Sequence, residues 1–472
     1  MVFNSLTFLL FFAAVLVIDR VLKGWRARKV HLLIASYLFY AAWNPPFVLL
    51  LWLSTVVDWY AARGISSARS LALRRSFLAL SLATNLGLLA CFKYGGFLLE
   101  NLESLLEVFG VVFQPATFSV VLPVGISFYT FQTLSYTIDV YRGKTVPSSS
   151  FLDFALYVTF FPQLVAGPIV RSTEFLPQCL EAKRANGQQV GWGLTLLALG
   201  LVEKVVIADG VMARIADQVY ASSAPVSFLD AWAGTFAFSW QIFFDFAGYS
   251  TCAIGAALCL GFALPDNFRF PYAAVGFSDF WRRWHISLSS WLRDYLYIPL
   301  GGNRRGAVRT RINLMLTMLI GGLWHGAAWR FVIWGGLHGF YLGLERLVMK
   351  MPISRVLAGK LWMRPLVAVA TFGAVCVAWV FFRAETLPAA LRMCASMGSP
   401  GARESLLDAD QIAATFGGTA LLLYLQWKLR DTTLESVAAR MPGWLLSLVL
   451  LILLLLLYRV RGDSRAFIYF QF

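Results

Sequence analysis

Long apolar runs separated by short clusters of charge dominate this sequence. The runs 2–18, 30–42 and 47–60 come first, and five basic residues lie between positions 20 and 29. Apolar runs of this kind cross membranes as helices, and basic clusters mark their cytoplasmic ends. A cleaved signal peptide would carry its positive charge before the apolar run. The pattern therefore predicts a retained first span with its N-terminus outside.

Charge alternates in sign along the next part of the chain. After a second basic cluster, residues 76–92 form another apolar run, and residues 93–119 carry one lysine and the acidic residues Glu100, Glu103 and Glu107. Basic residues inside and acidic residues outside are consistent through four spans. We therefore expect 93–119 to be an external loop.

Proline and glycine interrupt the apolar runs from about residue 120 onward. Residues 121–144 and 151–171 are the clearest examples. Broken helices are tolerated at membrane depth only where protein or a cavity covers the freed backbone groups, so these segments are expected to line an interior site. Further apolar runs lie at 191–207, 231–246, 312–324, 365–382, 415–427 and 444–458.

The pattern as a whole predicts an all-α fold. We expect a polytopic transmembrane helical bundle of roughly 11–13 membrane segments, some of them broken or re-entrant. We interpret residues 1–472 as one integral membrane domain with N-terminal spans in 1–92, a core at about 120–348 and C-terminal spans in 365–458.

Composition supports a membrane protein. Hydrophobic residues make up 59% of the 472 residues, charged residues make up 14%, and the formal net charge is +15. A soluble domain is far less apolar. The basic residues lie in short clusters between apolar runs, which indicates membrane topology and an anionic ligand rather than nucleic acid. The six cysteines form no CxxC pair, so neither a zinc site nor a disulfide framework is indicated.

The stretch 281–338 is the richest in candidate chemistry because it holds three of the four histidines, His285, His325 and His338. His325 lies 325 − 311 = 14 residues after Arg311, and no charge lies between Ile312 and Trp324. In a helix this separation corresponds to roughly 20 Å of depth. An ionisable side chain at such depth indicates a functional site, although a histidine that only hydrogen-bonds between helices is the alternative.

Arginines crowd the segment that precedes this run. Residues 269–311 contain eight arginines and two aspartates, interleaved with aromatic residues. Arginine pairs with phosphate through two parallel hydrogen bonds and stacks on aromatic rings. A folded cytoplasmic surface for a phosphate-rich donor, such as a coenzyme A thioester, would suit this composition. The alternatives are a solvated positive-inside loop and a site for anionic lipid headgroups. The donor-binding candidates are Arg293, Arg304 and Arg305.

Several long motifs resemble a known family. They are PVGISFYTFQTLSYTIDVYRGK, FFPQLVAGPIVR, FRFPY, SDFWRRWHISLSSWLRDYLYIPLGGNRRG, GGLWHGAAWRFVIWGGLHG and WVFFRAE. They resemble the membrane-bound O-acyltransferases, in particular the bacterial branch with the alginate O-acetylases. The resemblance implies a helical bundle around a central tunnel. It also implies that His325, in the WHG segment, is catalytic and that His285, 40 residues earlier, is the second polar position.

The chemistry of these residues fits acyl transfer. Burial disfavours the imidazolium, so a neutral His325 could accept the proton of a hydroxyl that attacks a thioester. A covalent acetyl-histidine is the alternative. His285, Trp324 and Asp294 are candidates for orienting His325 or the donor. His338 is either a supporting residue or a structural one, and His31 is interpreted as a loop residue.

The resemblance implies that acetyl passes from cytosolic acetyl-CoA across the bacterial inner membrane to an exported polysaccharide, with alginate favoured. We expect no tightly bound cofactor and no metal. The expected partners are membrane lipids, a periplasmic serine-esterase-like acetyl acceptor protein, and the polysaccharide synthesis and export machinery. Cellulose or peptidoglycan acetylation, D-alanyl transfer to teichoic acid, and transport are the alternatives. A transporter would be expected to show repeat symmetry, and the sequence shows none.

Overall fold

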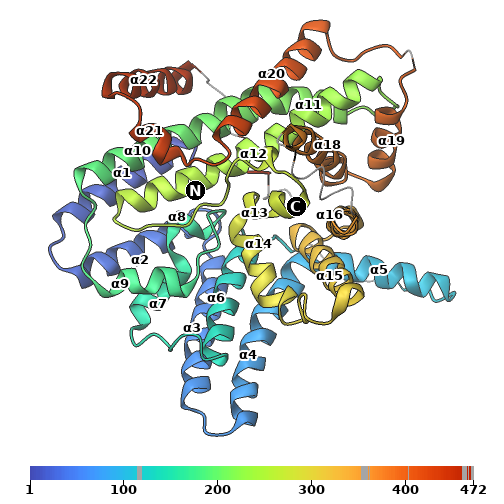
Figure 1. The fold of residues 1–472 in the computed structure, drawn as a ribbon. Coiled ribbons are helices and arrows are strands. Elements are labelled where there is room, and N and C mark those ends of the chain that lie inside the picture. The colour runs from blue at the N-terminus through green and yellow to red at the C-terminus, as the bar shows by residue number, and fades with distance from the viewer. Residues whose placement is uncertain are drawn as a thin grey trace. The chain divides into compact units, whose positions relative to one another are not determined.

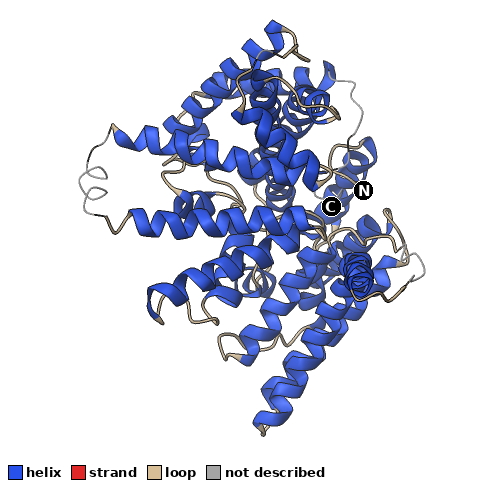
Figure 2. Cartoon of the chain, turned by 90° about the vertical axis from the view of Figure 1, so that its right-hand side faces the viewer, coloured by secondary structure: helices blue, strands red, loops and turns tan. Residues whose placement is uncertain are grey.

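The computed structural model describes residues 1–113, 120–351, 360, 362–401, 403–459, 465, 467 and 468. Over these residues the chain forms helices joined by loops and no strand (Figure 2). The expectation of an all-α fold is confirmed. Contacts divide the chain into two compact units, residues 1–197 with 252–265 and residues 198–251 with 266–472. The single domain expected from the sequence stays a prediction.

The first unit holds the N-terminal helices and the segments interrupted by proline and glycine (Figure 1). Its helices are α1 (Leu6–Val21), α2 (Trp25–Ala41), α3 (Phe47–Ser67), α4 (Leu71–Leu89), η1 (Ala90–Tyr94), α5 (Gly95–Val108), α6 (Ile126–Tyr141), α7 (Phe151–Thr159), α8 (Phe161–Leu164), α9 (Ser172–Leu180) and most of α10 (Gly187–Leu201).

The second unit begins within α10 and contains the segment rich in histidine and arginine (Figure 1). Its helices are η2 (Val202–Met212), α11 (Ala213–Tyr220), most of α12 (Phe228–Cys259), η3 (Pro271–Ala273), α13 (Phe277–Arg283), α14 (Ile286–Leu292), η4 (Arg293–Tyr297), α15 (Gly306–His325), α16 (Trp329–Val348), α18 (Met363–Arg383), α19 (Leu387–Gly398), α20 (Ala409–Leu429), α21 (Leu434–Ala439) and α22 (Gly443–Arg459).

Four helical stretches among the described residues are long and apolar enough to cross a membrane. They are α3, the continuous stretch Leu71–Val108, α12 and α18. Of the 18 most apolar consecutive residues in each stretch, 83% are buried in α12 and only 17% in Leu71–Val108. The former therefore lies inside the protein, and the latter presents most of its surface to its surroundings.

Two expectations about the N-terminal segments are wrong. His31 lies within helix α2 and not in a loop. The helix includes the basic residues around it because Arg28 pairs with Asp19 at 2.7 Å and Lys29 pairs with Asp153, all four being buried. Paired charges can enter a helix that packs inside the protein, so a basic cluster does not by itself mark a loop.

The stretch 93–119 also differs from the external loop that was expected. Its first part continues α4 as η1 and α5 as far as Val108. Leucines and glutamates alternate there with a helical period, which a reading based only on net charge overlooks. Residues 114–119 lie outside the described residues.

Aromatic side chains form much of the core of the second unit. Four of its tryptophans are among the largest fully buried side chains: Trp240, Trp284, Trp334 and Trp379. Trp334 stacks on Trp379 at 5.6 Å between ring centroids, and Trp284 lies 5.0 Å from Trp379. Rings of this size fill space with little conformational freedom. They form a rigid surrounding for the histidines of the same unit.

Candidate active site

Helix α15 separates the arginine cluster from His325. The helix begins after the exposed side chains of Arg304 and Arg305 and ends at His325. Its 20 residues extend about 30 Å at the rise of an α-helix. The two arginines and His325 therefore lie at opposite ends. The helical conformation that the depth estimate for His325 requires is confirmed.

Glycines allow α15 and α16 to pack backbone against backbone. A Cβ atom on Gly322 would lie 2.2 Å from the carbonyl oxygen of Phe331, and one on Gly335 would lie 2.2 Å from that of Met318. Neither distance can accommodate a methyl group without movement of the backbone. This contact fixes the position of α16, and with it Trp334, beside the end of α15.

The imidazole of His325 is enclosed by aromatic rings. Its centroid lies 4.9 Å from Trp334, 5.0 Å from Trp324 and 5.5 Å from Phe382. The whole residue is 3% exposed. Trp324, a predicted supporting residue, also lies 6.0 Å from His285 and therefore contacts both predicted catalytic histidines.

The structure brings His285 beside His325. Their ring centroids lie 6.4 Å apart, and His285 is fully buried with its ring edge-on to Phe246 at 4.6 Å. His285 precedes α14 with a φ of 43°, a left-handed conformation that is uncommon for a residue with a side chain. Such backbone strain is typical of functional sites and persists only where the surroundings enforce it.

This position of His285 changes the interpretation of 269–311 as a cytoplasmic loop. The segment reaches the His325 end of α15 through α13 and α14, and it returns through η4 to the arginine end. The aromatic residues explain the difference. Phe280, Trp284 and Trp291 are buried within the second unit instead of lying at its surface. A folded segment was expected, but not one that enters the interior.

Asn267 holds His285 in place. Its Oδ1 lies 3.1 Å from Nδ1 of His285 and accepts hydrogen bonds from the hydroxyl and the backbone N–H of Ser287 at 2.9 and 3.3 Å. Its Nδ2 donates to the hydroxyl of Ser250 at 3.1 Å. A backbone N–H can only donate, so the atom facing it must be the amide oxygen. The proton of a neutral His285 then lies on Nδ1, and Nε2 carries the lone pair.

His338 lies in the same aromatic cluster but not against His325. Trp334 stands between them, at 4.8 Å from His338 and 4.9 Å from His325. Phe280 stacks on His338 at 5.8 Å, and Trp281 meets it edge-on at 5.0 Å. Both ring nitrogens are buried without a hydrogen-bonding partner among the residues that the structure describes. This setting favours a packing role that acts on His325 through Trp334.

The remaining predicted residues lie on η4 and at the start of α15. Asp294 accepts a hydrogen bond from Nε of Arg293 at 2.8 Å, and this bond raises the pKa of the arginine. Asp294 therefore lies beside an arginine of the predicted donor surface, and its predicted role in orienting His325 or the donor stays a prediction. Arg293, Arg304 and Arg305 are all exposed, as side chains that bind a donor must be.

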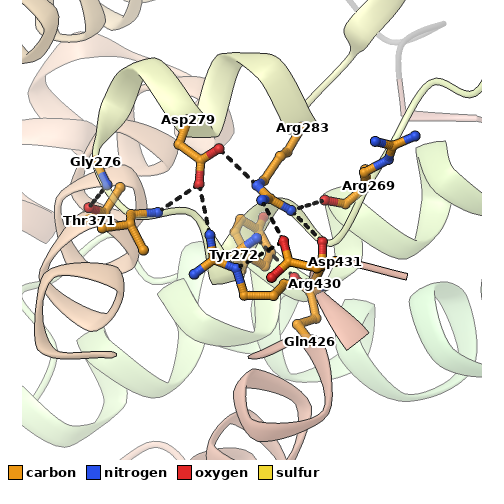
Figure 3. Close-up of polar contacts among 10 residues, drawn as sticks. Arg269, Tyr272, Gly276, Asp279, Arg283, Thr371, Gln426, Arg430 and Asp431 are labelled. Carbon is orange, nitrogen blue, oxygen red and sulfur yellow. Dashed lines mark hydrogen bonds and ion pairs between the residues drawn. The ribbon is translucent and has the colours of Figure 1, made fainter. Parts of the chain in front are cut away.

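Not every arginine of this segment is available to a ligand. Arg283 pairs with Asp279 at 3.0 Å and with Asp431 at 3.5 Å, and Arg430 reaches Asp279 at 3.4 Å (Figure 3). Nη1 of Arg283 also donates to the carbonyl oxygens of Arg430 and Arg269 at 2.7 and 3.4 Å. This network attaches α13 to the end of α20. His285 lies two residues after the end of α13. The network therefore also fixes the position at which the chain enters the site.

Sequence comparison with known proteins shows the family of this chain. A sequence model of the membrane-bound O-acyltransferase family matches residues 145–381, which is half of the chain. The chain is 43% identical over 429 residues to the probable alginate O-acetylase AlgI of Pseudomonas aeruginosa, covering 90% of this chain and 80% of that protein. The chain belongs to the membrane-bound O-acyltransferase family. The resemblance inferred from the motifs is confirmed, and this acyltransferase is a membrane protein.

Relatives with other names are also similar to this acyltransferase. The peptidoglycan O-acetyltransferase of Helicobacter pylori is 38% identical over 403 residues, covering 78% of this chain and 73% of that protein. The teichoic acid D-alanyltransferase of Bacillus subtilis is 26% identical over 272 residues, covering 55% of this chain and 68% of that protein. The acyl group and the acceptor therefore differ among similar proteins.

The sequence motifs did not reveal Asn267 as a member of the site. It lies in the connection between α12 and η3, between Asp266 and Phe268. An asparagine in a loop is ordinarily a turn residue. The signal that could have identified it is its position just before the FRFPY motif, although its contact with His285 appears only in three dimensions.

Proposed function

We propose that this acyltransferase moves acetyl from cytosolic acetyl-CoA to an exported polysaccharide, with alginate as the favoured polymer. The observation that carries the proposal is the pair of buried imidazoles of His285 and His325, whose centroids lie 6.4 Å apart. The relatives named alginate O-acetylases, which are 41–43% identical to this chain over most of its length, support the choice of acyl group and polymer.

His325 is the proposed general base. The hydroxyl oxygen of the acceptor attacks the thioester carbonyl carbon while the neutral imidazole takes the hydroxyl proton. The tetrahedral intermediate collapses, the carbon–sulfur bond breaks, and the proton passes to the departing thiolate. His285, held by Asn267 with its proton on Nδ1, would use the lone pair of Nε2 to help orient the reacting groups.

The exposed arginines are the proposed donor surface. Arg293, Arg304 and Arg305 offer guanidinium groups that match the geometry of the coenzyme A phosphates. The distance of about 30 Å between the ends of α15 then requires the donor to extend its thioester along the protein toward His325. The pantetheine arm of coenzyme A is a flexible chain suited to such an approach. Free acetyl-CoA is a substrate in this proposal, and no tightly bound cofactor takes part.

Placement in the bacterial inner membrane follows from this donor and acceptor, because acetyl-CoA is cytosolic and the polymer is exported. A periplasmic serine-esterase-like protein would receive the acetyl group on its way to the polymer, and the synthesis and export machinery would supply the chain. The competing assignments are acetylation of peptidoglycan, acetylation of cellulose, and D-alanyl transfer to teichoic acid. Similar proteins are named for the first and the last of these activities. Neighbouring genes for the synthesis of one polymer would discriminate among them.

Replacement of the proposed base tests the function. His325→Ala should leave membrane insertion and abundance intact and abolish polymer acetylation, because it removes the base while the surrounding rings retain their own packing. Polymer acetyl content and protein level would be measured together. His31→Gln, which changes a histidine of the first unit, is the matched control and should retain acetylation. Normal acetylation in the His325 variant would contradict the assignment.

The orientation can be tested with single cysteines in a cysteine-free background. Ser278 is a poor labelling site because its N–H and hydroxyl both bind Glu345, at 2.8 and 3.2 Å. Val308, at the arginine end of α15, is 64% exposed, and Ser104 on α5 is also exposed. A membrane-impermeant thiol reagent added to intact cells should label Ser104→Cys and not Val308→Cys. The reverse pattern would place the donor surface outside, where acetyl-CoA is absent.

A further inference from the structure

Helix α5 is amphipathic, with opposite faces of leucine and glutamate. At 100° per residue, three leucines fall within about 60° of one another on one side of the helix. The three glutamates fall on the opposite side. The leucines are Leu98, Leu102 and Leu105, and the glutamates are Glu100, Glu103 and Glu107. We call the first group the leucine stripe.

The leucine stripe is uncovered in the folded chain. Leu98, Leu102 and Leu105 are 57%, 41% and 55% exposed, and Phe109, which continues the stripe, is 74% exposed. Helix α5 has no buried residue. The stripe therefore contributes nothing to the core of the first unit. A row of apolar side chains along one face of a helix indicates a surface that contacts something other than water.

The connection of α5 to α4 limits what that contact can be. The two helices and η1 form one stretch of 38 residues, Leu71–Val108, which is about 57 Å of helix. A bilayer core of about 30 Å needs only some 20 residues. Arg69 lies just before α4, and Arg74 and Arg75 lie in its first two turns, so the excess length belongs to α5. This helix must either project into water or turn along the membrane.

The backbone favours the turn. The π-helical segment η1 and the glycine pair Gly95 and Gly96 lie at the junction, and features of both kinds bend helices. Helix α5 turns away from the direction of α4 (Figure 1). Gly110 then ends it in a left-handed conformation, with its N–H bonded to Glu107 and that of Val111 bonded to Leu106. These two bonds form a helix-terminating motif.

We propose that α5 lies along the membrane interface on the side opposite the basic cluster 69–75. Its leucine stripe enters the acyl-chain boundary, and its glutamates face water. The bend places α5 across the end of a transmembrane helix, where lipid is the neighbour already present. The helical spacing of α5 points its leucines and its glutamates in opposite directions, as a helix at the membrane–water interface requires. A straight continuation would instead leave the leucine stripe in water.

Spin labels at adjacent positions can test this placement. Leu102→Cys and Glu103→Cys would be made singly in a cysteine-free enzyme, labelled with a nitroxide and placed in phosphatidylcholine and phosphatidylglycerol nanodiscs. Collision with oxygen, which concentrates in lipid, would be compared with collision with a water-soluble nickel chelate. We expect the ratio of oxygen to nickel collisions to be several-fold higher at Leu102 than at Glu103. Leu105→Cys and Glu107→Cys provide a second pair and should repeat this difference.

Two results would overturn the proposal. Equal and high access of nickel to both labels of a pair would place α5 in water. Shielding of the leucine-stripe labels from both reagents would show that protein, such as a second copy of this chain, covers the stripe. Retained abundance and polymer acetylation in each cysteine variant would show that the labelled enzyme is folded. These substitutions change only exposed side chains, so loss of the fold is not expected.

Discussion

Removal of the Asn267 side chain should impair catalysis without removing either histidine. Asn267→Ala deletes the acceptor of the His285 Nδ1 proton and of the two Ser287 donors, and it also deletes the donor to Ser250. The backbone carbonyl of residue 267 still accepts from the N–H of Ile286 at 2.9 Å, so the loop keeps one attachment. The perturbation therefore acts mainly on the orientation and the tautomer of His285.

The size of the effect follows from the hydrogen bonds that are lost. A neutral hydrogen bond contributes about 1 kcal/mol, and a buried donor left without an acceptor costs about 1–3 kcal/mol. With 1.4 kcal/mol per factor of ten, loss of the bond that selects the Nδ1–H tautomer should lower the rate of acetyl transfer about 10- to 100-fold. The structure supports this range because Asn267 is 1% exposed and water cannot easily replace its oxygen.

A carboxylate at the same position separates positioning from packing. Asn267→Asp keeps an acceptor for His285 and Ser287 but adds a negative charge that stabilises the His285 imidazolium. If neutral His285 is required, activity is lost as the ring takes up a proton, so the acidic limb of the pH–rate profile should move to higher pH. Initial rates would be measured in proteoliposomes across pH for the wild type and both variants. A wild-type rate in Asn267→Ala, or an unshifted profile in Asn267→Asp, would refute this role.

Two further predictions concern the α15–α16 contact and the donor surface. Gly335→Ala places a methyl group 2.2 Å from a carbonyl oxygen and should destabilise the purified enzyme by about 1–3 kcal/mol in thermal unfolding. Gly343→Ala, on the same helix with no atom within 4 Å of its Cβ, should be neutral or stabilising, and equal effects would contradict the packing argument. Replacement of Arg304 and Arg305 by glutamine should weaken the binding of a non-hydrolysable acetyl-CoA analogue and reduce its dependence on salt. Unchanged affinity would indicate that these arginines set the membrane topology or bind lipid headgroups and do not bind the donor.

The sequence was sufficient for the helical class and for the helix that carries His325. An uncharged run between Arg311 and His325 leaves little alternative to a helix in an apolar environment, and α15 has this conformation. The family motifs also marked His285, and the structure places its ring next to that of His325. These features depend on local periodicity and on long motifs, both of which are visible without knowledge of the fold.

Charge patterns were a weaker guide because they do not show which charges are paired. Arg28 and Lys29 looked like loop residues but lie buried in a helix against Asp19 and Asp153. Arg283 looked like part of a donor surface but belongs to an internal network. Whether a charge faces solvent or a partner depends on chain segments far away in the sequence.

Only the tertiary structure decided how the site is supported. His325 became the end of a rigid hairpin because Gly322 and Gly335 touch across α15 and α16. His285 obtained its tautomer from Asn267, which belongs to a different loop and carries no motif of its own. A sequence records the chemical types of the side chains and the local preferences of the backbone. The distances between side chains arise from packing over the whole unit, and they determine which of those groups can act together.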